Sequence, residues 1–126
     1  RFNAKYAWNK TEVIKSGDDK FAIGKQLIYS PEHLFNSSVK VEYKNYTMSF
    51  QSCFTGRRYI STDNTDYLKG YLINNISSGI KIGEGRNVIN INLKVENLFN
   101  ASYQAIEWYP MPGRSFSLSV IYQFTK

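Results

Sequence analysis

The sequence predicts an all-β fold, an antiparallel up-and-down meander of about six strands. Three observations support this prediction: apolar and polar residues alternate with a period of two, turn-forming residues separate the alternating runs, and the connections are alternately long and short. The alternation is clearest in residues 89–95 and 116–124, where every second residue is apolar. A strand with one apolar and one polar face gives this pattern.

The first three strands are expected at residues 2–14, 35–44 and 46–55. The first places Phe2, Ala4, Tyr6 and Trp8 on one face and ends in a long polar loop over residues 15–34. Only Lys44 and Asn45 are available to connect the second strand to the third, which indicates a tight hairpin turn.

The last three strands are expected at about residues 67–82, in the run from Ile89 to Val95, and at residues 116–124. The fourth strand keeps its apolar phase at Leu72, Ile76, Ile80 and Ile82, although Asn74 falls in the same phase. A short turn from Gly83 leads into the fifth strand, and a long loop over residues 100–114 leads into the sixth.

The composition of the 126-residue chain is that of an ordinary soluble domain, with 42% hydrophobic and 21% charged residues. No stretch of about 18 consecutive apolar residues is present, which excludes a transmembrane helix. A transmembrane β-barrel passes this test, because each strand needs about 9 to 11 residues and only every second one faces lipid. The aromatic content of 16% fits the aromatic girdles of such a barrel, and it fits other β-rich proteins equally well.

The charged and reactive residues indicate neither nucleic-acid binding nor catalysis. The net charge is +6, but the basic residues are scattered and form no recognisable nucleic-acid reader, so no nucleic-acid partner is expected. Cys53 is the single cysteine and falls on the polar phase of the third strand, which excludes an intrachain disulfide. His33 stands alone, and Asp63 to Asp66 lack the glycine and acidic residues of a calcium loop. We therefore expect a protein that is not an enzyme and that has no metal site and no cofactor.

Three motifs near the end of the chain resemble the C-terminal end of a TonB-dependent outer-membrane receptor. These are the run Asn97-Leu98-Phe99-Asn100 at the end of a strand, the approach Tyr109-Pro110-Met111-Pro112-Gly113-Arg114, and the aromatic finish at Tyr122 and Phe124. Segments around residues 29–33, 54–59 and 70–76 are also similar to the family, so the resemblance covers residues 1–126. Thr125 and Lys126 depart from the pattern, because the family usually ends at the terminal aromatic residue.

The resemblance implies a segment of a large transmembrane β-barrel. Barrels of this family have roughly 22 strands around a plugged lumen, and six strands cannot close a barrel in a membrane. We therefore expect residues 1–126 to be the C-terminal barrel segment of a longer receptor, without its plug domain. The implied location is the bacterial outer membrane. The implied function is active uptake of a scarce nutrient such as a ferric siderophore, haem, cobalamin or a glycan.

The same resemblance suggests partners and binding residues. The partners would be the TonB complex, through the missing N-terminal part, the barrel-assembly machinery, outer-membrane lipid and lipopolysaccharide, and a small-molecule ligand. Loops 15–34, 56–66 and 100–114 would be extracellular, and the two short turns periplasmic. The ligand-binding candidates lie in two of these loops: Arg57, Arg58, Tyr59, Glu107, Trp108 and Tyr109. Tyr122 and Phe124 resemble the signal that the barrel-assembly machinery reads.

Alternative interpretations remain open for these loop residues and for the protein as a whole. Trp108 and Tyr109 would also suit anchors at the level of the lipid headgroups, and Arg57 and Arg58 would suit contacts to lipopolysaccharide phosphates. The whole chain would also suit a small soluble ligand-binding β-barrel, such as a lipocalin-like carrier, in which the apolar phase points inward. Such a carrier needs about eight strands, whereas six are found here.

Overall fold

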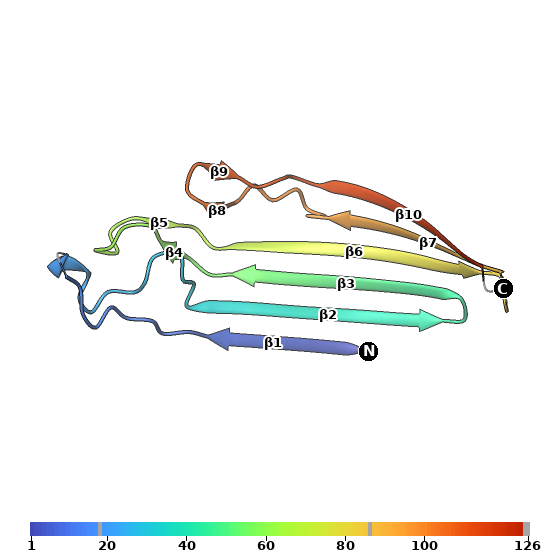
Figure 1. Ribbon diagram of the computed structural model, residues 1–126, viewed down its shortest axis with the longest axis horizontal. Helices are drawn as coiled ribbons and strands as arrows, with labels where there is room; N and C mark the ends of the chain where they lie inside the picture. The colour runs from blue at the N-terminus through green and yellow to red at the C-terminus, as the bar shows by residue number, and fades with distance from the viewer. Residues whose placement is uncertain (18, 86, 125–126) are drawn as a thin grey trace.

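The computed structural model of the protein describes residues 1–17, 19–85 and 87–124, so Thr125 and Lys126 lie outside the described residues. Six long strands form one antiparallel sheet in the order β1-β2-β3-β6-β7-β10 (Figure 1). Their bounds are β1 (Phe2–Trp8), β2 (His33–Tyr43), β3 (Tyr46–Thr55), β6 (Tyr71–Ile82), β7 (Asn87–Glu96) and β10 (Ser115–Phe124). Each long strand pairs with the next long strand along the chain. The predicted all-β meander of six strands is therefore confirmed.

The register gives the sheet one apolar and one polar face. Residues paired directly across an antiparallel ladder share a face, and Phe35 of β2 pairs with Phe54 of β3, which pairs with Leu72 of β6. The apolar phases of the six strands fall into the same rows, so they form one continuous face. The opposite face carries mostly polar side chains, among them Lys5, Asn36, Gln51, Asn75, Asn92 and Lys94.

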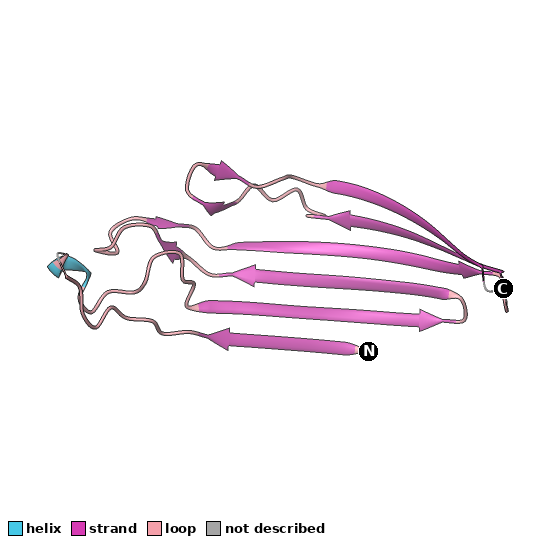
Figure 2. Cartoon of the chain, in the orientation of Figure 1, coloured by secondary structure: helices cyan, strands magenta, loops and turns pink. Residues whose placement is uncertain are grey.

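The apolar face is not covered by any second layer of the described chain (Figure 2). All ten residues of β10 are exposed, and Ala22 and Val88 are the only buried apolar residues in the described part. β1 and β10 each pair along one edge only. A soluble carrier would bury its apolar phase in a closed core, so this open single layer does not favour the lipocalin-like alternative.

Asn74 interrupts the apolar face, as the sequence pattern predicts. It pairs with Ser52 across the β3–β6 ladder, and Ser52 pairs with Ser37 of β2. The Ser52 hydroxyl donates a hydrogen bond to Asn74 Oδ1, and only 7% of the Asn74 residue is exposed. The polar side chain is thus partly satisfied within the sheet.

The short and long connections lie at opposite ends of the sheet (Figure 1). Tyr43 pairs with Tyr46, so Lys44 and Asn45 form the predicted two-residue turn between β2 and β3. The β6–β7 turn begins at Gly83, whose φ is +92° and where a Cβ would lie 2.3 Å from the Asn87 carbonyl oxygen. Only glycine tolerates both conditions. The three long loops lie together at the other end of the sheet, and this group of loops is called the loop layer below.

Two predicted boundaries are corrected by the structure. β1 ends at Trp8 rather than at residue 14, because its partner β2 begins at His33 and the preceding Pro31 has no N–H to extend the ladder. Val13 instead donates to Lys25 O at 2.9 Å, within the first loop. The fourth long strand begins at Tyr71 rather than at residue 67, and β5 (Tyr67–Leu68) pairs with β4 (Arg58–Tyr59).

The other loop elements are small. The third loop contains a hairpin of β8 (Gln104–Ile106) and β9 (Tyr109–Pro110), which the sequence pattern does not predict. The first loop contains one turn of 3-10 helix, η1 (Lys20–Ala22). No helix in the described residues has the length and apolar character that crossing a membrane requires.

Candidate functional site

The first and second long loops are joined by hydrogen bonds. The Asn64 side-chain amide pairs with the Gln26 backbone: its Oδ1 accepts from Gln26 N at 2.7 Å and its Nδ2 donates to Gln26 O at 3.0 Å. Tyr29 N donates to Tyr59 O at 2.8 Å, so the two loops also share a backbone contact. The first loop is thus fixed to the second, although the loops contain almost no buried apolar residue.

The turn that presents Asn64 is stabilised by its own polar residues. Asp63 Oδ1 accepts hydrogen bonds from Thr65 N at 3.2 Å and from Thr65 Oγ1 at 2.9 Å. Hydrogen bonds from Ser61 and Thr65 lower the pKa of the Asp63 carboxyl below its ordinary value. Asn64 itself has a φ of +59°, a conformation that asparagine adopts more readily than most residues.

Arg57 and Tyr59 belong to an exposed cationic and aromatic cluster with Tyr67. The Arg57 guanidinium lies 5.4 Å from the centre of the Tyr59 ring and 5.9 Å from the centre of the Tyr67 ring. The two tyrosine rings meet edge to face at 6.4 Å, across the β4–β5 pair. Cation–π contacts of this kind hold the guanidinium beside the rings while it stays accessible to water.

Arg58 has the opposite environment, because only 4% of it is exposed. Its guanidinium donates to Gln104 O at 2.9 Å, to Ala105 O at 3.1 Å and to Lys69 O at 3.5 Å. The same group lies 4.9 Å from the centre of the Tyr71 ring. The structure therefore uses Arg58 to connect the second loop to the third.

The β8–β9 hairpin presents the other three candidate residues. Glu107 and Trp108 form its turn, and Ile106 pairs with Tyr109 below the turn. Trp108 is 82% exposed and has a φ of +64°, which is unfavourable for a bulky side chain. The chain thus accepts backbone strain at a highly exposed aromatic residue, a combination that is found at binding sites.

A cleft of about 340 Å³ separates β5 from the segment that leads into β8. The cleft is lined by Tyr67, Leu68, Lys69, Ser102, Tyr103 and Gln104. Beside it, the centres of the Tyr71 and Tyr103 rings lie 4.4 Å apart. Burial raises the pKa of the Tyr103 phenol, and the neighbouring Tyr71 and Glu96 raise it further. The phenol therefore stays protonated and available as a hydrogen-bond donor at neutral pH.

The asparagines of the Asn97-Leu98-Phe99-Asn100 run hold the base of the third loop. Asn97 is 4% exposed; its Oδ1 accepts from Ala101 N and its Nδ2 donates to Ala101 O, both at 2.8 Å. Asn100 Oδ1 accepts from Arg114 N at 2.9 Å. A Cβ on Gly113 would lie 2.6 Å from that oxygen, which explains a glycine before Arg114. The motif that carries the resemblance is therefore a loop anchor.

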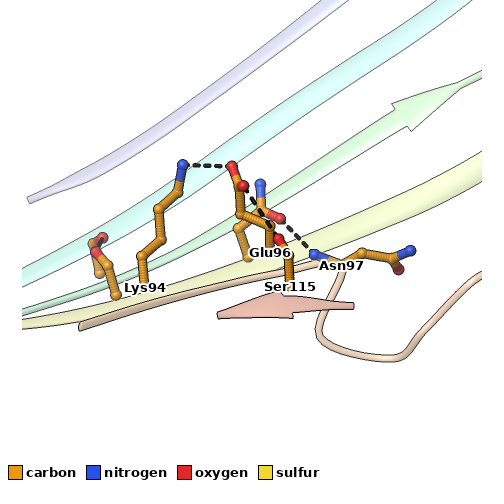
Figure 3. A network of polar contacts seen from close by, with 7 residues as sticks. Lys94, Glu96, Asn97 and Ser115 are labelled. Atoms are coloured by element: carbon orange, nitrogen blue, oxygen red, sulfur yellow. Dashed lines mark hydrogen bonds and ion pairs between the residues drawn. The ribbon is translucent and has the colours of Figure 1, made fainter. Parts of the chain in front are cut away.

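A polar network continues from this anchor onto the polar face of the sheet (Figure 3). Lys94 Nζ donates to Glu96 Oε1 at 2.5 Å, and Ser115 Oγ donates to Glu96 Oε2 at 3.4 Å. Asn97 N donates to Asn75 Oδ1 at 3.0 Å. These contacts connect β6, β7 and β10 at the end where the third loop begins.

The two groups of predicted residues, 57–59 and 107–109, both lie in the loop layer, but the exposure of their side chains differs. Arg57, Tyr59, Trp108 and Tyr109 are at least partly accessible, whereas Arg58 is buried between the loops. Tyr67, Lys69 and Tyr103 lie beside them and are not predicted by the sequence pattern. Their position follows from the β4–β5 pair, and the two-residue strands of that pair are too short to give a periodic signal. Among the described residues, no group of three His, Cys, Asp or Glu side chains is placed to hold a metal ion.

An open antiparallel sheet with one apolar face, one polar face and two unpaired edges has the architecture of a segment of a transmembrane β-barrel wall. A comparison with solved structures agrees. The chain is similar to the ferric citrate transporter FecA in its unliganded form, with a TM-score of 0.83 and 18% sequence identity. The match covers 94% of this chain and 20% of that chain.

The likeness to FecA is one of fold, and it agrees with the predicted resemblance to a barrel segment. It also confirms the predicted fold class. Neither the protein-family models nor the curated protein sequences contain a match to the chain.

Proposed function

We propose that the chain is a wall segment of an outer-membrane receptor that takes up a small-molecule nutrient by TonB-dependent transport. The main support is the exposed apolar face of the six-stranded sheet, opposite a polar face that suits a hydrated lumen. The likeness in fold to a ferric citrate transporter supports the same assignment. An enzymatic role has no comparable support. In this proposal the plug domain and the contact to the TonB complex belong to other parts of the receptor.

The membrane assignment is tested by measuring which face of β7 contacts lipid. Spin labels are attached to single cysteines at positions 89–95 of the complete receptor, in a background in which Cys53 is replaced by serine. Ile89, Ile91, Leu93 and Val95 should be accessible to oxygen dissolved in the bilayer, and Asn90, Asn92 and Lys94 to a water-soluble relaxation agent. If neither reagent reached the labels at these four apolar positions, the result would instead indicate a closed soluble core.

The ligand is proposed to bind at the loop layer. Arg57, Tyr59, Glu107, Trp108 and Tyr109 are the proposed direct contacts, because they offer cationic, aromatic and hydrogen-bonding groups at the accessible end of the sheet. Ferric citrate is the first ligand to test, since the structural neighbour transports it; other ferric siderophores, haem, cobalamin and glycans follow. Uptake that depends on both TonB and one of these ligands would support the proposal, and a receptor that takes up none of them would contradict it.

Tyr122 and Phe124 are proposed to be read by the barrel-assembly machinery. Both lie on the apolar face at the end of β10 and are about three-fifths exposed, at 60% and 62%. Tyr122 also donates a hydrogen bond to Asn87 Oδ1 at 2.8 Å, so a double change to serine removes one contact as well as the two rings. Tyr122→Phe is the matched control, because it removes the hydrogen bond alone. The double serine variant should lower the surface level of the receptor, and an unchanged level would contradict this role.

A further inference from the structure

We propose that the cleft between β5 and residues 102–104 binds an anionic oxygen group, and that Arg58 is the positioning residue that sets the width of this cleft. The inference deepens the proposed function, on which it rests, by assigning a charge to part of the ligand. It depends on three observations: the residues that line the cleft, the backbone groups that Arg58 contacts, and the charges that lack a partner.

Arg58 connects the two walls of the cleft. Its Nη2 donates to Lys69 O on one wall and to Gln104 O on the other, and its Nη1 donates to Ala105 O. Lys69 and Gln104 both line the cleft. A guanidinium is rigid and planar, so one side chain fixes the separation of two backbone segments that are otherwise 35 residues apart in the sequence (104 − 69).

The positive charges near the cleft are not neutralised. Within the described residues, neither Arg58 nor Lys69 has a carboxylate oxygen within 4.0 Å. Arg58 is 4% exposed, and its Nε is buried without a hydrogen-bond partner. A buried charge that is contacted only by carbonyl dipoles and one aromatic ring leaves much of its desolvation cost uncompensated. An anion in the neighbouring cleft would offset part of that cost.

The lining of the cleft suits such an anion. Among the lining residues, Lys69 carries an ammonium group, and Tyr67, Ser102 and Tyr103 carry hydroxyl groups that can donate hydrogen bonds. Among the residues that the structure describes, no acidic side chain lines the cleft. Carboxylate and phosphate oxygens are the groups that ammonium and hydroxyl donors bind most strongly. Lys81, which is exposed at the end of β6 far from the long loops, is not part of the cleft lining, so it provides a control of equal charge.

The binding site is tested with inorganic phosphate as the probe. The complete receptor, purified in detergent without lipopolysaccharide, is titrated with phosphate at constant ionic strength, and binding is followed by ³¹P NMR. We expect saturable binding that Lys69→Met and Arg58→Met each weaken by about tenfold or more, since each removes a charge-assisted contact or its support. Lys81→Met should change the dissociation constant by less than about twofold, as for a change away from the site.

Comparison of the three variants distinguishes a specific site from general attraction of phosphate to a basic surface. The absence of saturable binding, or equal effects of all three variants, would overturn the anion site. Lys69→Met tests the site even if Arg58→Met fails to fold. Competition by added lipopolysaccharide would assign the anion to a lipid headgroup, and the lack of competition would assign it to a free ligand. A receptor that still transports its nutrient but does not bind phosphate would overturn this inference and leave the proposed function standing.

The positioning role of Arg58 has its own measurement. Pulsed electron paramagnetic resonance between spin labels at positions 66 and 107 reports the separation of the second loop from the β8–β9 hairpin. Arg58→Met and Arg58→Lys should both broaden the distance distribution, because lysine keeps the charge but not the fork of donors. Arg57→Met should leave it unchanged. A narrow, unshifted distribution in Arg58→Met would overturn the positioning role.

Discussion

At the scale of single residues, hydrogen bonds from polar side chains hold the loops of this chain together, whereas buried apolar side chains have that role in most folds. Asn64, Asn97 and Asn100 each have a positive φ, and each uses its side-chain oxygen to accept a backbone N–H from a residue four or more positions away. Buried side-chain amides that replace missing backbone contacts are expensive to remove, because their partners are left without a hydrogen bond. The loops therefore depend on a few asparagines.

Asn97→Ala should loosen the base of the third loop. The change leaves the Ala101 N–H and C=O without their partner and places alanine at a φ of +50°, for a cost of about 2–3 kcal/mol. Hydrogen exchange at the backbone amides of residues 98–101 should become faster in the variant. Asn90→Ala, in the preceding strand β7, is the matched control, since the Asn90 side chain makes no hydrogen bond within the described residues. Equal exchange rates in the two variants would contradict the anchoring role.

The turn at Asp63 should lose stability in acid. The pKa of this carboxyl is lowered in the folded chain from its ordinary value of 3.8, by hydrogen bonds from Ser61 and Thr65. Its contribution is therefore present at pH values above 3.8 and is lost as the pH falls through the lower native pKa. Thr65→Val removes one donor and should raise the Asp63 pKa toward 3.8, measured by NMR titration of labelled aspartate. A pKa that Thr65→Val leaves unchanged would show that the hydroxyl of Thr65 has no effect.

At the scale of elements, the β8–β9 hairpin combines local strain with support from outside. Its turn places Trp108 at a φ of +64°, while Arg58 holds its first strand through two backbone carbonyls. A two-residue turn with a positive φ favours glycine or asparagine. Tryptophan at this point costs about 1 kcal/mol of strain, and we propose that contact of its ring with the ligand is what offsets that cost.

Trp108→Gly tests what the ring contributes to binding without destabilising the turn of the hairpin. Because glycine suits the turn better than tryptophan does, the hairpin should be at least as stable in the variant. We expect the KM for uptake of the ligand to rise by about tenfold, as for the loss of one aromatic contact, while the surface level of the receptor stays the same. Trp108→Tyr should retain most of the affinity. An unchanged KM in Trp108→Gly would show that the ring does not contact the ligand and would favour the role of an anchor at the lipid headgroups.

The long strands were predictable from the sequence, and the elements of the loops were not. β3 lies at Tyr46–Thr55 as predicted, because its alternation and the adjacent turn residues agree. The start of β6 was misplaced by four residues, since Tyr67 and Leu68 continue the apolar pattern but pair with β4. Contacts such as those of Arg58 join residues 46 and 47 positions apart, and no local pattern in the sequence encodes them.

At the scale of the whole molecule, the sheet is stable only if something covers its apolar face. Phe116, Leu118 and Val120 are 61–70% exposed, and they continue the rows of β7 and β6. An apolar surface that extends over six strands is far larger than the patches found on soluble monomers. The free edges at β1 and β10 add unpaired backbone groups, which also favour association.

The isolated chain should therefore self-associate in water. Without detergent we expect oligomers or aggregates by light scattering, and with detergent micelles a much smaller particle, because the micelle covers the apolar rows. Within the complete receptor, Leu93→Arg on the apolar face should cost about 2–4 kcal/mol, and Asn92→Arg on the polar face much less. A monodisperse monomer of the isolated chain in plain buffer would contradict the assignment of the apolar face to lipid.

The interlocked loops described above limit how such a receptor could change its ligand. Lengthening a single loop is inexpensive in entropy, since each doubling of its length costs about 0.6 kcal/mol. Replacing that loop alone would nevertheless break the Asn64 contact to the first loop or the Arg58 contact to the third. The three long loops therefore depend on one another for their conformation. Ligand preference should pass between related receptors when all three are exchanged together, and should be lost when one is grafted alone.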